Sequence, residues 1–290
     1  NAGKLILPVL ISVSSYQINM WFNSTLATKF DTVTIMSYVQ NLILVSILSV
    51  IYSITGVYFP NLTKLWALNN KEEFKNILYN IISTVIFLLI PATAGFIALR
   101  LDIINLLAKW GDFSLESAII SSNMLGLYAF GIVGIGIKEI LDKAFYSQQD
   151  TKIPAIFGFI IMISNIILST FFLKVIKLGT YSMPLAYSIA SFIGALGLCI
   201  IINRRIRFID KNLFILIFKS LFATFIMLIF VYFVMLIISD INILNSKILT
   251  RIFKTFVPSI VGVIIYFIMA IILKINLVYT IFVKDKKRID

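Results

Sequence analysis

Long apolar runs alternate with short polar stretches along this sequence. A transmembrane helix needs about 20 mostly apolar residues. Eight runs of about that length are found, over residues 5–29, 34–59, 77–99, 117–138, 153–173, 182–203, 213–238 and 253–275. Because lipid offers no hydrogen-bond partners to an open strand, each run is predicted to be a helix. The pattern therefore predicts an all-α polytopic membrane protein with eight transmembrane helices.

The stretches between the runs carry residues that start and stop helices. Asn70, which acidic residues follow, is predicted to cap the third helix. Asp150 or Thr151 is predicted to cap the fifth helix, with Pro154 in its first turn, where a missing N–H costs nothing. Pro60 is expected to separate the second span from a short, leucine-rich interfacial helix.

Composition supports the membrane assignment and excludes several kinds of chemistry. Of the 290 residues, 60% are hydrophobic and 13% are charged, whereas soluble domains carry about 25% charged residues. The chain has no histidine and one cysteine, Cys199, inside an apolar run. A disulfide within the chain, a Cys/His metal site and histidine acid–base catalysis are therefore excluded. No Walker-type phosphate loop is found, so the sequence predicts no enzyme and no cofactor.

The distribution of positive charge predicts the orientation in the membrane. The net charge is +12, and about two thirds of the lysines and arginines fall on the face that holds Asn1 if the eight spans alternate. Cytoplasmic loops are the ones enriched in Lys and Arg. Both ends, including the basic tail over 284–290, and the polar loop over 144–155 are therefore predicted to be cytoplasmic. This charge indicates contact with anionic lipid rather than with nucleic acid.

Polar residues recur on one face of each of the first two spans, where they are costly unless they have a role. The first stripe consists of Ser12, Tyr16, Asn19 and Asn23. The second consists of Thr34, Tyr38, Asn41, Ser49 and Tyr52, with Gln40 beside it. Such stripes either line a wet cavity or hold helices together through hydrogen bonds. A smaller polar patch in the fifth span contains Ser164, Asn165 and Ser169.

The fourth span combines glycines with a group of charges. Gly126, Gly131, Gly134 and Gly136 allow close helix packing or bending. Lys138 with Asp142, and Glu139 with Lys143, are expected to form i,i+4 pairs. The pairs fall at the cytoplasmic end of the predicted span. There they form either a solvated helix end, or a site where Lys138 meets an anionic headgroup at the inner mouth of a cavity.

The loop after these charges has no nucleophile–base pair and is not catalytic, with Phe145 and Tyr146 expected at the interface. Its sequence FYSQQDTKIP (145–154) resembles the hallmark loop of the MurJ/MviN family of lipid II flippases. LPVLISVSSYQIN (7–19), YFPNLTKL (58–65) and KWGDFSLES (109–117) resemble further segments of that family, in the same order. The resemblance covers residues 5–205, and the last 85 residues match in hydropathy alone.

The resemblance implies a MATE-like fold of two six-helix lobes followed by two extra helices. The spans of this chain would be numbers seven to fourteen: the second lobe over 1–205, then two additional helices and a basic cytoplasmic tail over 206–290, with the first lobe before Asn1. The implied function is transport of a lipid-linked peptidoglycan precursor across the bacterial cytoplasmic membrane by alternating access. The implied partners are this lipid-linked glycan, membrane lipids and cell-wall synthesis proteins, with no nucleic acid.

On this interpretation the polar stripes bind substrate and the polar loop gates the cavity. The substrate-binding set is Ser12, Tyr16, Asn19, Asn23, Gln40, Asn41 and Lys138, with Lys138 at the pyrophosphate. The gate set is Phe145, Tyr146, Asp150 and Pro154. The resemblance also places an acid–arginine pair of the family at the positions of Gln40 and Asn41. Two alternatives remain: an exporter of another undecaprenyl-linked polysaccharide, and a scaffold that recruits wall-synthesis proteins without transport.

Overall fold

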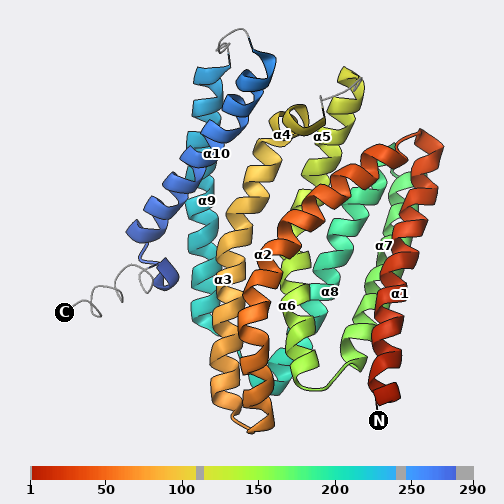
Figure 1. Ribbon diagram of the computed structural model, residues 1–290, viewed down its shortest axis with the longest axis vertical. Coiled ribbons are helices and arrows are strands. Elements are labelled where there is room, and N and C mark those ends of the chain that lie inside the picture. Colours follow the sequence, from red (N-terminus) through yellow and green to blue (C-terminus); the bar gives the residue numbers. More distant parts are fainter. Residues whose placement is uncertain (1, 109–113, 240–245, 279–290) are drawn as a thin grey trace. The chain divides into compact units, whose positions relative to one another are not determined.

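The computed structural model describes residues 2–108, 114–239 and 246–278, apart from the side chains of residues 2–13, 16 and 108 (Figure 1). The described chain is helical apart from short connections. Its α-helices are α1 (Ala2–Ala27), α2 (Val33–Ala67), α3 (Lys71–Ala98), α4 (Arg100–Ala108), α5 (Leu115–Phe130), α6 (Ile132–Ser147), α7 (Lys152–Lys174), α8 (Ser182–Ile206), α9 (Lys211–Ile238) and α10 (Lys247–Ile272). Short 3₁₀ turns, η1 (Thr28–Phe30) and η2 (Gly179–Tyr181), follow α1 and precede α8. The predicted all-α fold is confirmed.

Most of these helices are long and apolar enough to cross a membrane. Six described segments meet that requirement: α2, α3, α7, the segment Gly179–Ile206 that contains α8, α9 and α10. The bent pair α5 and α6 provides a seventh span if its two parts are taken together. The chain is therefore a multi-pass membrane protein. The first predicted span coincides with α1, about half of whose side chains lie outside the described part, so the total of eight spans stays a prediction.

The helices form two compact units. The first unit contains Asn1–Val85 and Leu127–Ile209, and the second contains Ile86–Gly126 and Asp210–Asp290. In the first unit α7 packs against α1 and α8, and α6 packs against α8 and α2, as Figure 1 shows. In the second unit α10 packs against α9 and α4. These units do not correspond to the predicted division after residue 205, which stays a prediction.

Helix α2 does not stop at Pro60. It continues through the proline to Ala67 and has 35 residues, which corresponds to about 50 Å. A proline ring crowds the carbonyl four residues earlier. Here that residue is Gly56, which has no side chain to restrict bending of the backbone. The predicted separate interfacial helix is therefore wrong. Two of its leucines, Leu62 and Leu65, are buried on the same continuous helix, whereas Leu68 just after the helix is exposed.

The predicted fourth span is divided into two helices at Gly131. Helices α5 and α6 meet there at an angle of 44°, and α6 continues to Ser147. A break exposes backbone carbonyls, which need other donors inside a membrane. Ser188 of α8 donates to the carbonyl of Leu127 at 2.6 Å, and Ser191 donates to that of Gly131 at 3.4 Å. Ser188 therefore satisfies the carbonyl of Leu127 at the bend, whereas the carbonyl of Gly131 also accepts a hydrogen bond from the N–H of Ile135 at 2.9 Å.

Two of the predicted helix caps are confirmed. The side chain of Asn70 accepts a hydrogen bond from the backbone N–H of Glu73 at 3.2 Å. Asp150 Oδ1 accepts from the N–H groups of Lys152 and Ile153 at 3.2 and 3.3 Å, and Pro154 lies in the same first turn of α7. These two caps fix where α3 and α7 begin.

Candidate functional site

The first unit contains a cavity of about 440 Å³ lined by residues of α1, α2, α6, α7 and α8. The lining includes charged and hydrogen-bonding side chains, among them Asn19, Tyr52, Lys138, Glu139, Asp142 and Tyr187. Charged side chains inside a membrane-spanning bundle are costly and mark functional positions. This polar cavity is therefore the candidate site.

Three charged side chains of α6 form an ion-paired triad in the cavity. Lys138 Nζ lies 3.0 Å from Oε1 of Glu139 and 2.7 Å from Oδ2 of Asp142. The side chains of Lys138 and Glu139 are 21% and 22% exposed, whereas that of Asp142 is 6% exposed. The predicted Lys138–Asp142 pair is confirmed. The predicted partner of Glu139 is wrong, because Glu139 pairs with Lys138, and Lys143 Nζ lies 5.9 Å from the centre of the Tyr146 ring.

The bend at Gly131 changes the position of Lys138 within the span. The sequence predicts the span to end at Lys138, but α6 continues for nine residues beyond it, to Ser147. That places Lys138 roughly 14 Å from the end of the helix. The interpretation of the triad as a solvated helix end is therefore wrong. Its charges lie in the interior of α6 and face a cavity.

The asparagines of α1 bind α7 through a buried amide cluster. The side-chain nitrogen of Asn165 donates to Oδ1 of both Asn19 and Asn23, and that of Asn23 also donates to Oδ1 of Asn19. Ser169 Oγ donates to Asn165 Oδ1 at 3.4 Å. Asn23 is fully buried in this cluster, whereas Asn19 also lines the cavity. One stripe therefore holds two helices together and contributes to the cavity at Asn19.

The remaining predicted substrate-binding residues fall in three different environments. Gln40 is 1% exposed, with Nε2 at 2.9 Å from Met20 Sδ, and its Oε1 has no hydrogen-bond partner among the described residues. Asn41 is exposed on the next position of α2. The side chains of Ser12 and Tyr16 lie outside the described residues, although both belong to α1. The structure therefore brings Asn19 and Lys138 to one cavity but does not place Gln40 or Asn41 in its lining.

The predicted gate residues lie in and beside the turn between α6 and α7. Phe145 and Tyr146 are in the last turn of α6, Asp150 is in the connection, and Pro154 is in the first turn of α7. Arg205, at the end of α8, donates to Gln148 Oε1 at 3.0 Å and pairs with Asp150 Oδ2 at 2.7 Å. Its guanidinium carbon lies 5.2 Å from the centre of the buried Phe145 ring. Tyr146 lines the cavity. The turn is therefore tied to α8 at one end and contributes to the cavity at the other.

Sequence reasoning missed several contributors to the site, including Ser15 of α1, which lines the cavity. Tyr187 and Ser191 of α8 line the cavity, and Arg205 anchors the turn. A signal for the first two exists, because Tyr187, Ser188 and Ser191 place hydroxyl groups within one turn of a span that is otherwise apolar. Arg205 lies in a cluster of basic residues at a helix end, where sequence alone gives no reason to single one out.

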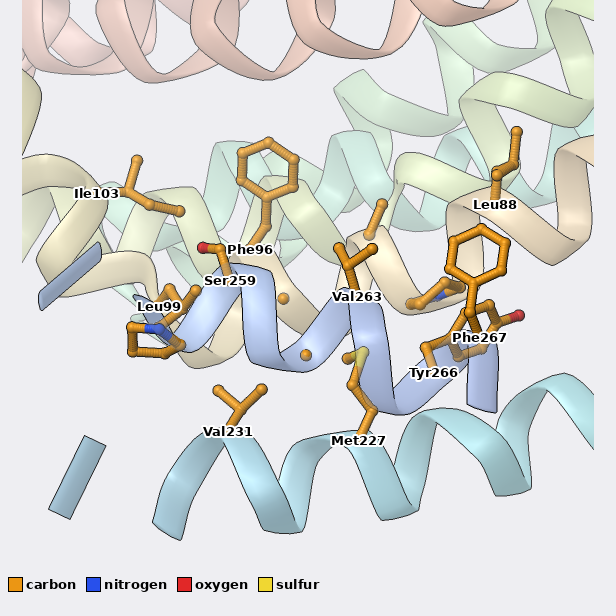
Figure 2. Close-up of a pocket in the computed structure, with 15 residues that line it drawn as sticks. Leu88, Phe96, Leu99, Ile103, Met227, Val231, Ser259, Val263, Tyr266 and Phe267 are labelled. Carbon is orange, nitrogen blue, oxygen red and sulfur yellow. The ribbon is translucent and has the colours of Figure 1, made fainter. Parts of the chain in front are cut away.

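The second unit contains an apolar pocket of about 310 Å³ between α3, α9 and α10 (Figure 2). Met227 and Val231 point from α9 toward α10 in that view. The two hydroxyl groups in the lining are already used, since Tyr266 donates to the carbonyl of Phe87 at 2.7 Å and Ser259 donates to that of Thr255. Nearby in α4, burial raises the pKa of Asp102, and Lys254 opposes the rise. The pocket suits hydrocarbon rather than sugar or phosphate.

A multi-pass helical protein with an ion-paired cavity among its spans has the features of a membrane transporter. The family model of the lipid II flippase MurJ matches residues 1–253. The chain therefore belongs to the MurJ family, as the sequence motifs predict.

Individual relatives agree with this family. The chain is 31% identical to the probable lipid II flippase MurJ of Vibrio cholerae over 170 residues, which are 58% of the chain and 32% of that relative. It is 33% identical to the lipid II flippase MurJ of Thermosipho africanus over 130 residues, 45% of the chain and 27% of the relative. The chain thus spans only about a third of the length of these curated relatives.

Solved structures share the fold. The lipid II flippase MurJ in an inward closed conformation matches 95% of this chain and 54% of its own length, with a TM-score of 0.77 and 24% identity. An outward-facing MATE transporter of the MOP superfamily matches 98% of this chain and 74% of its own length, with a TM-score of 0.61 and 10% identity. The predicted MATE-like fold is confirmed.

Proposed function

We propose that this chain forms the second lobe, with two additional helices, of a flippase that moves the lipid-linked peptidoglycan precursor lipid II across the bacterial cytoplasmic membrane. The lobe would comprise residues 1–205 and the additional helices and basic tail 206–290, with the C-terminus in the cytoplasm. Transport would proceed by alternating access and without covalent chemistry. The observation that carries this proposal is a charged cavity inside the spans of a MurJ-family chain.

The cavity offers groups for each polar part of such a substrate. Amides and hydroxyls, of which Asn19, Tyr52 and Tyr187 line the cavity, can hydrogen-bond sugar and peptide groups. Lys138 is the charged donor for the pyrophosphate. Its two carboxylate partners both lie on α6, and a phosphate oxygen is proposed to replace one of them on the ammonium. This exchange keeps the ammonium paired in both states.

The other predicted site residues would contribute indirectly or in another conformation. Asn23 fixes Asn19 through the amide cluster and is proposed to position it. Asn41 presents its amide on an exposed face of α2 and is proposed to meet substrate there, with Gln40 behind it. Ser12 and Tyr16 continue the stripe of Asn19 along α1 and are proposed to extend the cavity.

The segment over residues 145–154, which contains the turn between α6 and α7, is proposed to be the cytoplasmic gate. Tyr146 would act at the cavity, and Phe145, Asp150 and Pro154 would hold the turn in place. Support comes from the anchoring of Asp150 by Arg205 and the capping of α7. Membrane lipids surround the spans on this proposal, and cell-wall synthesis proteins are proposed as further partners.

Complementation of flippase-depleted bacteria with the full-length gene tests the proposal. Rescue of wall synthesis by the wild type, and its loss in Asn19→Leu and Lys138→Met while both variants reach the membrane, is the expected result. Glu72→Gln is a matched control, because Glu72 is exposed in the first turn of α3. If wild type fails here but restores export of another undecaprenyl-linked polysaccharide, the substrate assignment is wrong. Full rescue by both cavity variants would favour a scaffold that does not transport.

A further inference from the structure

Two carboxylates pair with the single positive charge of the Lys138 ammonium. It pairs with Glu139 at 3.0 Å and with Asp142 at 2.7 Å. With both carboxylates ionised, the three groups carry one net negative charge. A diphosphate diester brings two further negative charges, and like charges repel most strongly where little water screens them. The described lining contains one further cation, Lys143, whose Nζ lies 5.9 Å from the centre of the Tyr146 ring. The triad itself therefore opposes the anion that Lys138 is proposed to bind.

A buried oxygen of the triad has no hydrogen-bond partner among the described residues. Asp142 lines the cavity and is 4% exposed. Its Oδ2 pairs with Lys138, but its Oδ1 makes no hydrogen bond to any described group. A buried carboxylate oxygen without a donor is unfavourable. A proton on Oδ1 removes one negative charge, and a neutral carboxyl group costs less to bury than an ionised one.

The surroundings single out Asp142 among the groups that titrate. Other titratable groups of the lining, from α6, α2 and α8, are Lys138, Glu139, Lys143, Tyr146, Tyr52 and Tyr187. Among the described residues, those that α1 and α7 contribute to the lining are uncharged. Glu139 is the other carboxylate, but its side chain is 22% exposed against 6% for Asp142. Water can therefore solvate the charge of Glu139 better than that of Asp142.

We propose that Asp142 is a proton-binding site, and that binding of an anionic diphosphate at Lys138 is coupled to uptake of one proton by Asp142. The proton comes from water and adds at Oδ1. The resulting carboxylic acid no longer pairs with Lys138 as an ion, so the triad becomes neutral and a phosphate oxygen takes the vacated place on Nζ. When the diphosphate leaves, Asp142 returns the proton to water and pairs with Lys138 again. This inference rests on the proposed headgroup contact of Lys138.

Calorimetric titration of the purified full-length protein with UDP-N-acetylglucosamine tests the coupling. This soluble probe carries an N-acetyl sugar and a diphosphate diester whose charge is constant between pH 5.5 and pH 8. Linkage to one proton requires the affinity to rise by about tenfold for each pH unit lowered, until Asp142 is protonated in the free protein. When the titration is repeated in buffers of different ionisation enthalpy, the dependence of the binding enthalpy on the buffer gives the number of protons taken up. We expect uptake of up to one proton for each probe bound.

Two variants and a control separate the roles of the two residues. Asp142→Asn is expected to bind the probe about tenfold or more tightly than wild type at pH 8, with an affinity independent of pH. Lys138→Met is expected to weaken binding at every pH. The control Glu72→Gln, at an exposed position outside the cavity, is expected to keep the wild-type profile.

The outcomes distinguish this inference from the proposed function. Binding that needs Lys138 but does not vary with pH in the wild type overturns proton coupling and leaves the headgroup contact intact. Absence of binding in every protein at every pH overturns both. The wild-type profile decides whether binding is coupled to a proton, so an Asp142 variant that fails to fold leaves that decision intact. A matched Glu139→Gln variant that keeps the wild-type pH profile assigns the proton to Asp142, and one that loses it overturns that assignment.

Discussion

The close contact at the bend between α5 and α6 leads to a strong prediction about Gly131. An added Cβ at this position would lie 2.7 Å from Ser188 Oγ and 2.8 Å from Ser188 Cα. Both distances are shorter than real Cβ contacts. Because the second one involves backbone, rotation of a side chain cannot relieve it, and α6 and α8 would have to separate. We therefore expect Gly131→Ala to destabilise the folded protein.

The magnitude follows from two contributions. Forcing a methyl group into a packed contact costs about 1–3 kcal/mol. Separation of the helices also weakens the hydrogen bond from Ser188 to the carbonyl of Leu127, and such bonds between membrane helices contribute about 0.6 kcal/mol on average. The backbone at Gly131 has φ −76° and ψ −8°, which alanine adopts without strain. The expected loss of about 2–4 kcal/mol therefore comes from packing and hydrogen bonding.

Gly95→Ala is the matched control. Gly95 lies within α3, and an added Cβ meets no atom within 4 Å. Replacement of a helical glycine by alanine stabilises a helix by about 0.5–1 kcal/mol. The same chemical change is thus expected to have opposite signs at the two positions.

Thermal unfolding of the purified full-length protein in detergent, at one scan rate, measures the difference. We expect the midpoint to fall by roughly 5–10 °C in Gly131→Ala and to stay constant or rise in Gly95→Ala. Adding Ser188→Ala to Gly131→Ala is not expected to restore stability, because the contact with Cα remains. A midpoint in Gly131→Ala within one degree of wild type would refute the close approach of α6 and α8.

Three further predictions concern the polar contacts of the first unit. Asn165→Leu removes the donor to two asparagines of α1 and is expected to cost about 2–4 kcal/mol in chemical unfolding, against less than about 1 kcal/mol for Ser169→Ala. Lys138→Met leaves buried charge unpaired and is expected to cost about 3–5 kcal/mol; addition of Asp142→Asn should restore most of that stability. Arg205→Ala frees Asp150 and Gln148 and is expected to speed hydrogen exchange at residues 148–151 at least about tenfold, with partial recovery in Arg205→Lys.

Features of the site that depend on local sequence could be predicted, and those that depend on distant packing could not. The Lys138–Asp142 pair follows from i,i+4 spacing on any helix, and it is found. The distance of this pair from the end of the helix depends on how far α6 continues beyond the bend at Gly131. That bend is stabilised by Ser188, about 60 residues away along the chain. The spacing of glycines permits bending or close packing equally, and only the arrangement of α8 shows that both occur at Gly131.

The fold was predictable for a different reason. Hydropathy over a window of about 20 residues reports the most general constraint on a membrane chain, and that constraint acts on each helix separately. The hydropathy pattern predicted the positions of most helices. The predicted end of the second helix near Pro60 was wrong, because α2 continues to Ala67. Proline ends a helix when the free energy lost with the missing hydrogen bond exceeds the free energy that packing of the continued helix contributes. Leu62 and Leu65 are buried beyond it, so packing that the sequence does not reveal keeps the helix intact.

The stripe on α1 shows why a pattern of polar residues supports two interpretations at once. Helical spacing assigns residues to a face, but a face can contact more than one neighbour. Asn19 lies where α1 meets both α7 and the cavity: its Oδ1 accepts from Asn23 and Asn165, while the residue lines the cavity. Helix association and cavity lining are therefore not exclusive for this side chain. Because its carbonyl oxygen is held by α7, any movement of α7 relative to α1 must change what Asn19 presents to the cavity, which gives helix rearrangement a direct effect on the site.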